Sequence, residues 1–185
     1  MAGPRVRTLP TSELTGAEIE AIRAVLWRAF GDDPEEAFSE DDWAHALGGI
    51  HVLAEQDGRI VAHASVVARE LRVAGRPFRT GYVEAVAVDP DLQRRGVGTR
   101  VMEHVGAIVR DGFELGALGT GEHGFYERLG WQTWRGPTSV RPPAGGEQRT
   151  PEDDGCVLVL RTPTTPPDLD LSAPISCGWR PGDAW

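Results

Sequence analysis

The chain has 185 residues, of which 40% are hydrophobic and 25% are charged, the composition of a globular protein large enough for a full core. Its 28 acidic residues outnumber the 19 Lys and Arg residues, so the net charge is −9. Neither nucleic acid nor an anionic membrane is therefore expected as the main partner, because binding phosphate requires a basic surface. The charge is compatible with a cationic small molecule, but net charge taken alone favours solubility as its explanation.

Cysteines, histidines and the N-terminus carry few signals. Cys156 and Cys177 have neither metal-ligand spacing nor a disulfide framework, and the five histidines show no ligand spacing, so we expect no catalytic metal. The N-terminal residues lack the apolar core of a signal peptide, and no segment approaches the ~20 apolar residues of a membrane span. These features predict a cytoplasmic protein with no membrane partner.

The first predicted elements are a strand and two helices. Thr15 and Glu18 have the spacing of a capping box at the start of a helical apolar stripe, and Ser39 is the candidate N-cap of a second, shorter helix. An acidic loop separates the two helices. In chain order these elements are a strand at Val6–Leu9, a helix at Thr15–Phe30, the acidic loop at 32–42 and a short helix at Asp41–Leu47.

The following strands are separated by turn signals. Asp57-Gly58 is a strong hairpin signal, Gly75-Arg76-Pro77 marks a second turn, and Asp89-Pro90 ends the last strand of this run. The remaining elements are strands at Ile50–Glu55, Arg59–Leu71 and Phe78–Val88, a helix at Val97–Val109, a strand at Glu114–Leu118, a short helix at His123–Leu129, and strands at Trp131–Trp134 and Cys156–Leu160 separated by a loop at 141–151. This order predicts an α+β fold with a mixed central β-sheet flanked by helices.

Domain organisation follows from length and from the tail. We expect one domain covering residues 1–185. The tail, about 161–185, is rich in proline yet carries Trp179 and Trp185. Because two exposed indoles are unfavourable in water, the tail is expected to pack back on the domain.

The sharpest motif is an apolar strand that leads into a glycine-containing loop at the start of a helix. The strand is Val83–Val88 and the loop reads Gln93-Arg94-Arg95-Gly96-Val97-Gly98. Free N–H groups at such a helix start, with the helix dipole, bind phosphate or pyrophosphate, although a glycine-rich helix start is often purely structural. A Walker loop is excluded because no lysine precedes Thr99, and a dinucleotide fingerprint because position 101 is Val.

This motif resembles the pyrophosphate-binding motif of the GNAT acetyltransferases. A second motif, G-F-Y-E-R-L-G-W at 124–131, resembles the short helix whose tyrosine lies near the acetyl-CoA sulfur in that superfamily. The resemblance implies acetyl-CoA as co-substrate and Tyr126 as the acid that reprotonates the thiolate; a core residue is the alternative reading of Tyr126. The implied cofactor-binding residues are Val86, Ala87, Val88, Gln93, Arg94, Arg95, Gly96, Val97 and Gly98.

Longer tracts are similar to the aminoglycoside 2'-N-acetyltransferases. They include D-W-x-H-x-L-G-G at 42–49, G-Y-V-E at 81–84, G-P-T-S-V at 136–140, T-P-E-D-D-G at 150–155 and the terminal W-R-P-G-D-A-W. The resemblance implies transfer of acetyl from acetyl-CoA to the 2'-amino group of aminoglycosides such as gentamicin, tobramycin and kanamycin B. It also implies a homodimer and a role in antibiotic resistance.

Within this resemblance Glu84 is the expected base, directly or through water, because an ammonium nucleophile must lose a proton before it attacks. Tyr126 and the terminal carboxylate of Trp185 complete the catalytic candidates. Polycations require carboxylates, so acidic clusters supply most of the remaining substrate candidates. The substrate-binding candidates are Glu36, Asp42, Glu84, Ala85, Gly119, Glu152, Asp153, Asp183 and Trp185.

Three departures from the family pattern bear on drug range. Ala85 stands where a Gly often follows the glutamate, Gly119 replaces a serine, and the acidic loop 31–38 is longer, so that a substrate-contacting Asp of the family aligns near Ala37. Alternatives also stay open: Asp42 as a helix-capping acid, the acidic clusters as solvated loops, and Glu84 as a solvent-facing strand residue. At the level of function, the alternatives are a GNAT enzyme for another polyamine, amino sugar or cell-wall intermediate, and a non-catalytic aminoglycoside-binding protein.

Overall fold

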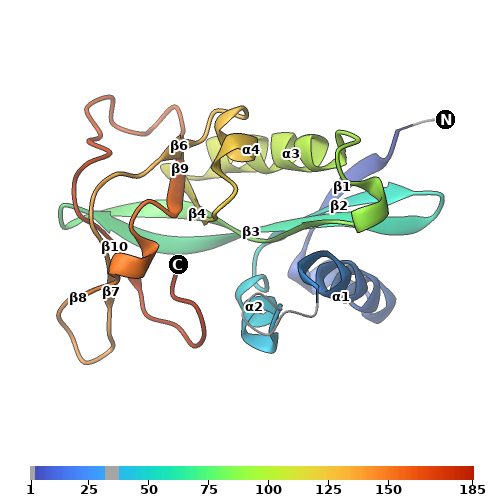
Figure 1. The fold of residues 1–185 in the computed structure, drawn as a ribbon, viewed down its shortest axis with the longest axis horizontal. Coiled ribbons are helices and arrows are strands. Elements are labelled where there is room, and N and C mark those ends of the chain that lie inside the picture. Colours follow the sequence, from blue (N-terminus) through green and yellow to red (C-terminus); the bar gives the residue numbers. More distant parts are fainter. Residues whose placement is uncertain (1–2, 32–37) are drawn as a thin grey trace. The chain divides into compact units, whose positions relative to one another are not determined.

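A computed structural model describes residues 3–31 and 38–185, which form two compact units. The first unit contains residues up to 67 together with 83–105, and the second contains 68–82 and 106–185. Three elements run through both units: β3 (Arg59–Val73), β4 (Arg76–Val88) and α3 (Val97–Gly112). Figure 1 shows the fold as a ribbon.

In the first unit the strands are ordered β1-β2-β3-β4. β1 (Arg5–Pro10) is antiparallel to β2 (Ile50–Gln56), and β2 is antiparallel to the first part of β3. The β2–β3 turn has positive φ at Asp57 (51°) and Gly58 (74°), the conformation that the Asp-Gly sequence predicts. The register of the β2–β3 pair shifts at one place, between Ala54 and Glu55 of β2.

Helices cover both faces of these strands. α1 (Gly16–Phe30) and α2 (Glu40–His45) lie on one face and the first part of α3 on the other (Figure 1). Both short-range caps are formed: Thr15 pairs with Glu18 and Ser39 with Asp42 in reciprocal capping boxes. The core under α1 and α2 consists of Ile22, Val25, Leu26, Phe38, Trp43, Ala46, Leu53 and Ala87.

In the second unit the strands are ordered β6-β9-β5-β4-β3-β10-β7-β8. The parallel pairs are β4–β5 and β10–β7, while the pairs β5–β9, β6–β9, β10–β3 and β7–β8 are antiparallel, so the sheet is mixed. The strands not yet given are β5 (Leu115–Gly119), β6 (Gln132–Thr133), β7 (Thr138–Arg141), β8 (Gln148–Arg149), β9 (Val157–Arg161) and β10 (Ile175–Gly178), and the helix α4 is His123–Glu127.

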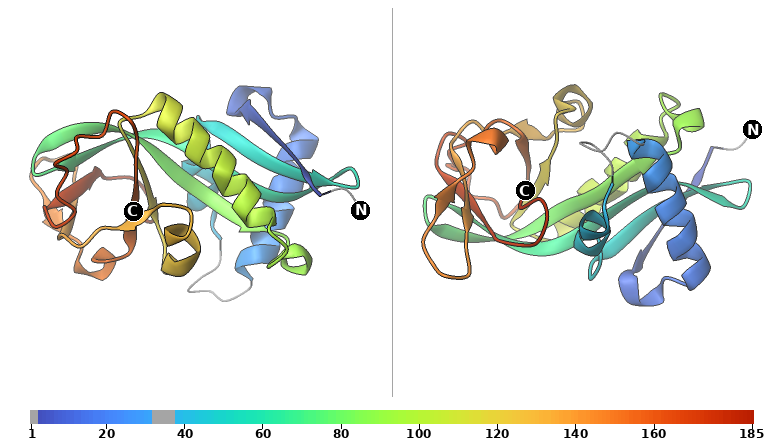
Figure 2. Two further views of the ribbon diagram at one scale, coloured as in Figure 1. Left: turned by 90° about the horizontal axis from the view of Figure 1, so that it is seen from above. Right: turned by 60° about the horizontal axis from the view of Figure 1, so that its bottom comes forward.

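The C-terminal residues return to the body of the second unit. β10 inserts between β3 and β7, and the segment after it, red in Figure 2, turns back toward the orange segment that precedes β9. Trp185 is 6% exposed, whereas Trp179 remains 54% exposed. One tail indole is thus buried and the other is largely in solvent. None of the helices in the described ranges 3–31 and 38–185 has the length and hydropathy of a membrane span.

Several predicted bounds differ from the observed ones. The second turn is made by Ala74 and Gly75, with φ of 47° and 81°, so Arg76 and Pro77 already belong to β4. Strand β6 is only two residues long, and β7, β8 and β10 were not predicted. These strands have two to four residues, too few for periodicity to distinguish them from loop. The predicted loop at 141–151 accordingly contains β8.

Candidate active site

The candidate base is carried by β4 in the first unit. Glu84 is half-buried, as are the next two residues, and Ala87 beyond them is 5% exposed. Ala85 has φ of 51°, which places a residue with a side chain in the left-handed region in the middle of a strand. The strand is therefore locally distorted directly after Glu84, at one of the positions where the sequence departs from the family pattern.

The loop between β4 and α3 has the geometry of an anion site. Asp89 caps the short 3-10 turn Pro90–Leu92 by accepting the Asp91 N–H, and Gln93 Nε2 donates to Val88 O at 3.4 Å. Gly96 has φ of 79°, a conformation that side chains disfavour. α3 then begins at Val97, so the N–H groups of its first turn are directed at the loop.

Two arginines of this loop are available to a ligand. Arg94 and Arg95 are both exposed, and neither forms an ion pair with any other described residue. Arg94 itself has φ of 60°. Unpaired guanidinium groups beside free helix N–H groups form a local basic site in an otherwise acidic chain, as a pyrophosphate would need.

In the second unit α4 supplies the candidate acid. Tyr126 is 8% exposed and makes edge contacts with Phe125, at a centroid distance of 4.9 Å, and with Trp131, at 6.4 Å. Burial, with a smaller contribution from Glu122, raises the pKa of Tyr126 to about 12. The phenol is therefore protonated at neutral pH, as a proton donor must be.

The terminal residue of the chain is held on several sides. Trp185 N donates to Asp183 Oδ1 at 3.1 Å, and its indole Nε1 donates to Thr150 Oγ1 at 3.2 Å. A Cβ placed on Gly119 would lie 3.3 Å from the Trp185 carboxyl carbon and 3.6 Å from the Tyr82 hydroxyl. The C-terminal carboxylate therefore lies against the end of β5, and Gly119 leaves room for it.

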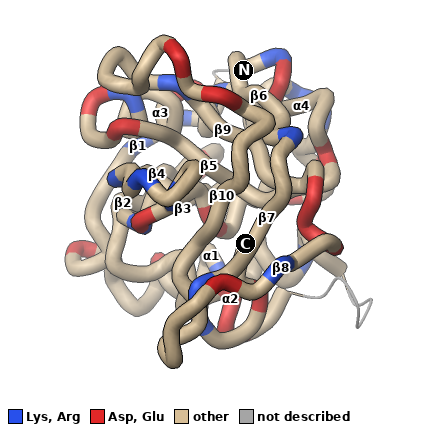
Figure 3. Tube along the Cα trace, turned by 90° about the vertical axis from the view of Figure 1, so that its left-hand side faces the viewer, with Lys and Arg blue, Asp and Glu red and all other residues tan. Residues whose placement is uncertain are grey.

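Acidic side chains gather around this terminus. The pKa of Asp153 is raised, chiefly by burial and further by the charges of Asp183, Glu152 and Asp154. Asp154 is different, because Arg149 and the Thr138 backbone hold its pKa well below the usual range. Acidic and basic positions are otherwise interspersed along the trace (Figure 3). The second unit thus brings together four predicted substrate residues: Gly119, Asp153, Asp183 and Trp185.

Other predicted substrate residues have different surroundings. Asp42 Oδ2 accepts hydrogen bonds from Ser39 N at 2.8 Å and Ser39 Oγ at 2.7 Å, so this carboxylate caps α2. Glu152 is exposed, and its carbonyl accepts a long contact of 3.8 Å from Cys156 Sγ. Glu36 lies outside the described residues. The described part of the chain contains no cluster of His, Cys, Asp and Glu that could hold a metal ion.

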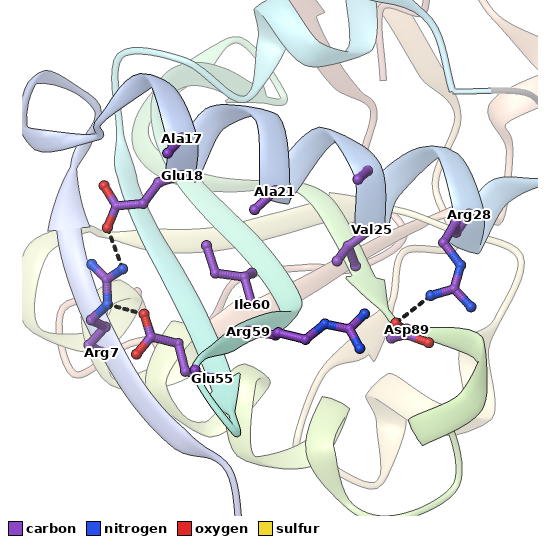
Figure 4. Close-up of a pocket in the computed structure, with 12 residues that line it drawn as sticks. Arg7, Ala17, Glu18, Ala21, Val25, Arg28, Glu55, Arg59, Ile60 and Asp89 are labelled. Atoms are coloured by element: carbon purple, nitrogen blue, oxygen red, sulfur yellow. Dashed lines mark hydrogen bonds and ion pairs between the residues drawn. The ribbon is translucent and has the colours of Figure 1, made fainter.

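A surface cavity of about 470 Å³ in the first unit lies between α1 and the β2–β3 hairpin (Figure 4). Its charged residues are largely paired: Arg7 Nε donates to Glu55 at 2.7 Å, and Arg28 Nη1 donates to Asp89 at 2.6 Å. Arg7 also pairs with Glu18. These ion pairs fasten α1 to the strands and to the end of β4, and the cavity contains none of the predicted catalytic residues.

Sequence reasoning missed the residues that fix the terminus. Arg69 Nη2 donates to Gly178 O at 3.1 Å and Ala184 O at 2.8 Å, and its guanidinium lies 4.5 Å from the centre of the Tyr82 ring. Arg180 Nε donates to Asp183 O at 2.8 Å. Arg180 stands in the quoted terminal tract, but nothing in the sequence around Arg69 marks it.

Comparison with known proteins gives the family. The acetyltransferase (GNAT) domain matches residues 11–134. The chain belongs to the GNAT acetyltransferases. It is also 44% identical, over 184 residues that make up 97% of the chain and 91% of the relative, to an aminoglycoside 2'-N-acetyltransferase of Mycolicibacterium fortuitum. The predicted family, the acetyltransferase class and the α+β GNAT fold are confirmed.

Solved structures support the same fold at low sequence identity. The GNAT N-acetyltransferase YhbS of Escherichia coli, in complex with CoA, has a TM-score of 0.65 at 15% identity, covering 96% of this chain and 91% of its own. A GNAT acetyltransferase of Brucella melitensis, in complex with acetyl-CoA, has a TM-score of 0.59 at 19% identity, with coverage of 92% and 94%. A GCN5-related N-acetyltransferase of Kribbella flavida has a TM-score of 0.58 at 23% identity; the match covers 73% of this chain but only 34% of that longer one.

Proposed function

We propose that this GNAT enzyme transfers the acetyl group of acetyl-CoA to the 2'-amino group of aminoglycosides. The observation that carries the proposal is the 44% identity to an aminoglycoside 2'-N-acetyltransferase, in an alignment that covers 97% of the chain. The domain match ends at residue 134, so a similarity that covers 97% of the chain continues well beyond it, through the segment that contains Asp153. We further propose that residues 1–185 act as a single catalytic domain and that the enzyme is a homodimer.

Acetyl-CoA binding is assigned to the β4–α3 region. The loop residues Gln93 to Gly98 offer helix N–H groups and two unpaired guanidinium groups to the pyrophosphate. The backbone of Val86–Val88 is assigned to the pantetheine arm and the thioester. Two of the solved GNAT relatives contain CoA or acetyl-CoA, which is consistent with this assignment for the present chain.

The aminoglycoside is assigned to the acidic surroundings of the C-terminus. A polycation is stabilised by carboxylates, and burial together with neighbouring negative charges already disfavours ionised Asp153. A bound ammonium group near Asp153, Asp183 and the Trp185 carboxylate would relieve that repulsion. The net charge of −9 favours the approach of the same cation.

The proposed reaction is direct transfer in a ternary complex. Glu84 accepts the proton of the substrate ammonium, directly or through water, and the free amine attacks the thioester carbonyl. As the amide forms, the nitrogen loses its second proton and the CoA sulfur takes one up and leaves as the thiol, while Tyr126 donates a hydrogen bond to the developing thiolate. With a pKa of about 12, well above the ~8.5 typical of a thiol, Tyr126 favours stabilisation of the thiolate over complete proton transfer.

A pair of kanamycins tests the proposal. Kanamycin B carries an amine at the 2' position and kanamycin A a hydroxyl, so thiol release from acetyl-CoA is expected with kanamycin B alone. Release with both compounds would move the reaction to another amine. The absence of thiol release with either kanamycin would favour a polyamine, an amino sugar or a cell-wall intermediate as substrate. Drug binding without thiol release would indicate a non-catalytic binding protein.

The role of Glu84 has its own test. Glu84→Gln retains the size of the side chain and removes the base, so kcat should fall about 10²-fold or more. The loss should decrease at high pH, where free amine is present without the base. Glu103→Gln, on α3, removes one carboxylate elsewhere in the first unit and serves as the matched control. Equal rates for Glu84→Gln and wild type would remove Glu84 from the mechanism.

A further inference from the structure

Two buried histidines of the first unit form a continuous hydrogen-bonded chain. His51 on β2 and His63 on β3 are both 0% exposed. His51 Nδ1 lies 2.8 Å from His63 Nε2, and His63 Nδ1 lies 2.7 Å from the carbonyl oxygen of Ala85. At the other end His51 Nε2 lies 2.8 Å from Thr11 Oγ1. The Trp43 ring lies 6.3 Å from each imidazole ring.

The direction of every bond follows from the Ala85 carbonyl, which can only accept. His63 Nδ1 must therefore donate, and a neutral His63 then accepts at Nε2 from His51 Nδ1–H. His51 Nε2 in turn accepts from the Thr11 hydroxyl at 2.8 Å, a shorter distance than the 3.3 Å to the other acceptor of that hydroxyl, Gly49 O. The Thr11 oxygen itself accepts the Gly48 N–H at 2.9 Å. Burial lowers the pKa of His63 to about 3 and that of His51 to about 4, in agreement with neutral rings.

The chain ends at the one distorted residue of β4. Ala85 has φ of 51°, in a region where a Cβ atom is disfavoured, and such conformations persist only when surrounding contacts hold them. The residue before Ala85 is Glu84 and the residue after it is Val86. Whatever fixes the Ala85 peptide therefore also sets the direction of the Glu84 side chain and of the Val86 N–H.

We propose that His63, oriented by His51 and Thr11, is a positioning residue that holds the left-handed conformation of Ala85 and thereby aligns Glu84 and the Val86 backbone for acetyl transfer. The inference rests on the proposed function for the roles of those two neighbours. A proton relay through the histidines is excluded, because a backbone carbonyl at its end cannot pass a proton on. The buried rings therefore act through geometry.

Two variants distinguish the effects of the two hydrogen bonds of His63, because each variant retains a polar atom at the position of only one ring nitrogen. The amide nitrogen of Asn lies near the position of His Nδ1, so His63→Asn retains the donor to Ala85. Gln extends to the position of Nε2, so His63→Gln retains the partner of His51 and loses the donor to Ala85. We expect kcat/KM and the Kd of acetyl-CoA to worsen about tenfold in His63→Gln and less than about threefold in His63→Asn.

Ala85→Gly supplies the decisive rescue. Glycine adopts positive φ without the Cβ penalty, so adding Ala85→Gly to His63→Gln should restore most of the activity that His63→Gln loses, with the single Ala85→Gly variant as the reference for the double variant. Val61→Ala, a buried change on the same strand with no side-chain hydrogen bond to lose, controls for general destabilisation. Equal losses in the Asn and Gln variants, or a double variant no better than His63→Gln, would overturn the inference.

A spectroscopic measurement on the wild-type protein is independent of activity and of variant folding. Imidazole ¹⁵N shifts should show both histidines neutral and protonated at Nδ1, the less common tautomer in water. Protonation at Nε2 of His63 would overturn the proposal. If the kanamycin assay fails while the tautomers and the acetyl-CoA affinities behave as stated, the substrate assignment is wrong and the positioning role of His63 stands.

Discussion

The indole Nε1 of Trp185, the last residue of the chain, donates a hydrogen bond of 3.2 Å to the Thr150 hydroxyl. Both residues are buried, with 6% and 8% of their surface exposed. The hydrogen bond from Trp185 N to Asp183 and the one from Arg69 to Ala184 O immobilise the same segment from the other side. The terminal carboxylate is thus a fixed charge, and not the end of a free tail.

Adding one glycine after Trp185 tests the importance of that fixed charge. The extension keeps every side chain but moves the carboxylate by about 3.8 Å. We expect the KM for kanamycin B to rise about tenfold, in line with the ~1.5–3 kcal/mol typical of hydrogen bonds to charged groups. The thermal midpoint and the KM for acetyl-CoA should change little. An unchanged kanamycin KM would remove the terminus from substrate binding.

Asp153 gives a prediction that links pH to stability. Its pKa is raised in the folded protein above the ordinary value of 3.8, so its stabilising contribution is complete below that value and is lost as pH rises through the folded-state pKa. Asp153→Asn should therefore be more stable than the wild type at neutral pH, with the difference disappearing in acid. The same variant should raise the KM for kanamycin B.

Urea titrations at about pH 7 and about pH 3 measure the stability difference, and steady-state kinetics measure the KM. Asp168→Asn, on a surface turn of the same unit, is the charge-matched control. A variant that is less stable than wild type at neutral pH would show that Asp153 is stabilised when ionised, against the direction derived from its burial.

Local signals in the sequence predicted much of this fold. The capping boxes at Thr15 and Ser39 and the Asp57-Gly58 hairpin depend on residues a few positions apart, and each is present in the structure. The glycine loop before α3 was found for the same reason, since strand, loop and helix are contiguous. Family tracts in the sequence added candidates that spacing alone does not give, among them Trp185.

Features formed by segments far apart in the chain could not be predicted from such local signals. β10 lies between β3 and β7, partners more than thirty residues away in the chain, and only four residues encode it. The contacts of Arg69 with the C-terminal segment span more than a hundred positions. The same holds for His51 and His63, which look like isolated histidines until β2 and β3 pair and bring their rings together.

The capping box of α1 supplies a test of folding. The Thr15 backbone and hydroxyl, with Arg7, lower the pKa of Glu18 from 4.5 to about 2. A depressed pKa contributes stability above about 4.5 that is lost as pH falls toward about 2. Glu18→Gln keeps the reciprocal bond of the box but removes the charge, and should cost ~1 kcal/mol at neutral pH.

The advantage of the wild type over Glu18→Gln should shrink steadily between those two pH values, as measured by urea titration. Glu13→Gln removes a charge from the preceding 3-10 turn, outside the box, and is the matched control. A difference that stays constant down to about pH 2 would mean that the charge of Glu18 does not contribute to folding.

Tyr126→Phe isolates the phenol of the candidate acid. The ring contacts with Phe125 and Trp131 remain, so the fold and the KM for acetyl-CoA should be retained, while kcat falls about 10–100-fold because the thiolate loses its hydrogen-bond donor. Since the pKa of Tyr126 is about 12, kcat of the wild type should show no basic limb from this group below about pH 10. Phe125→Leu perturbs the same helix without removing a hydroxyl, and should reduce stability more than kcat. A Phe variant with full kcat would assign Tyr126 to the core of the second unit, and the thiolate would then have to be stabilised by another donor.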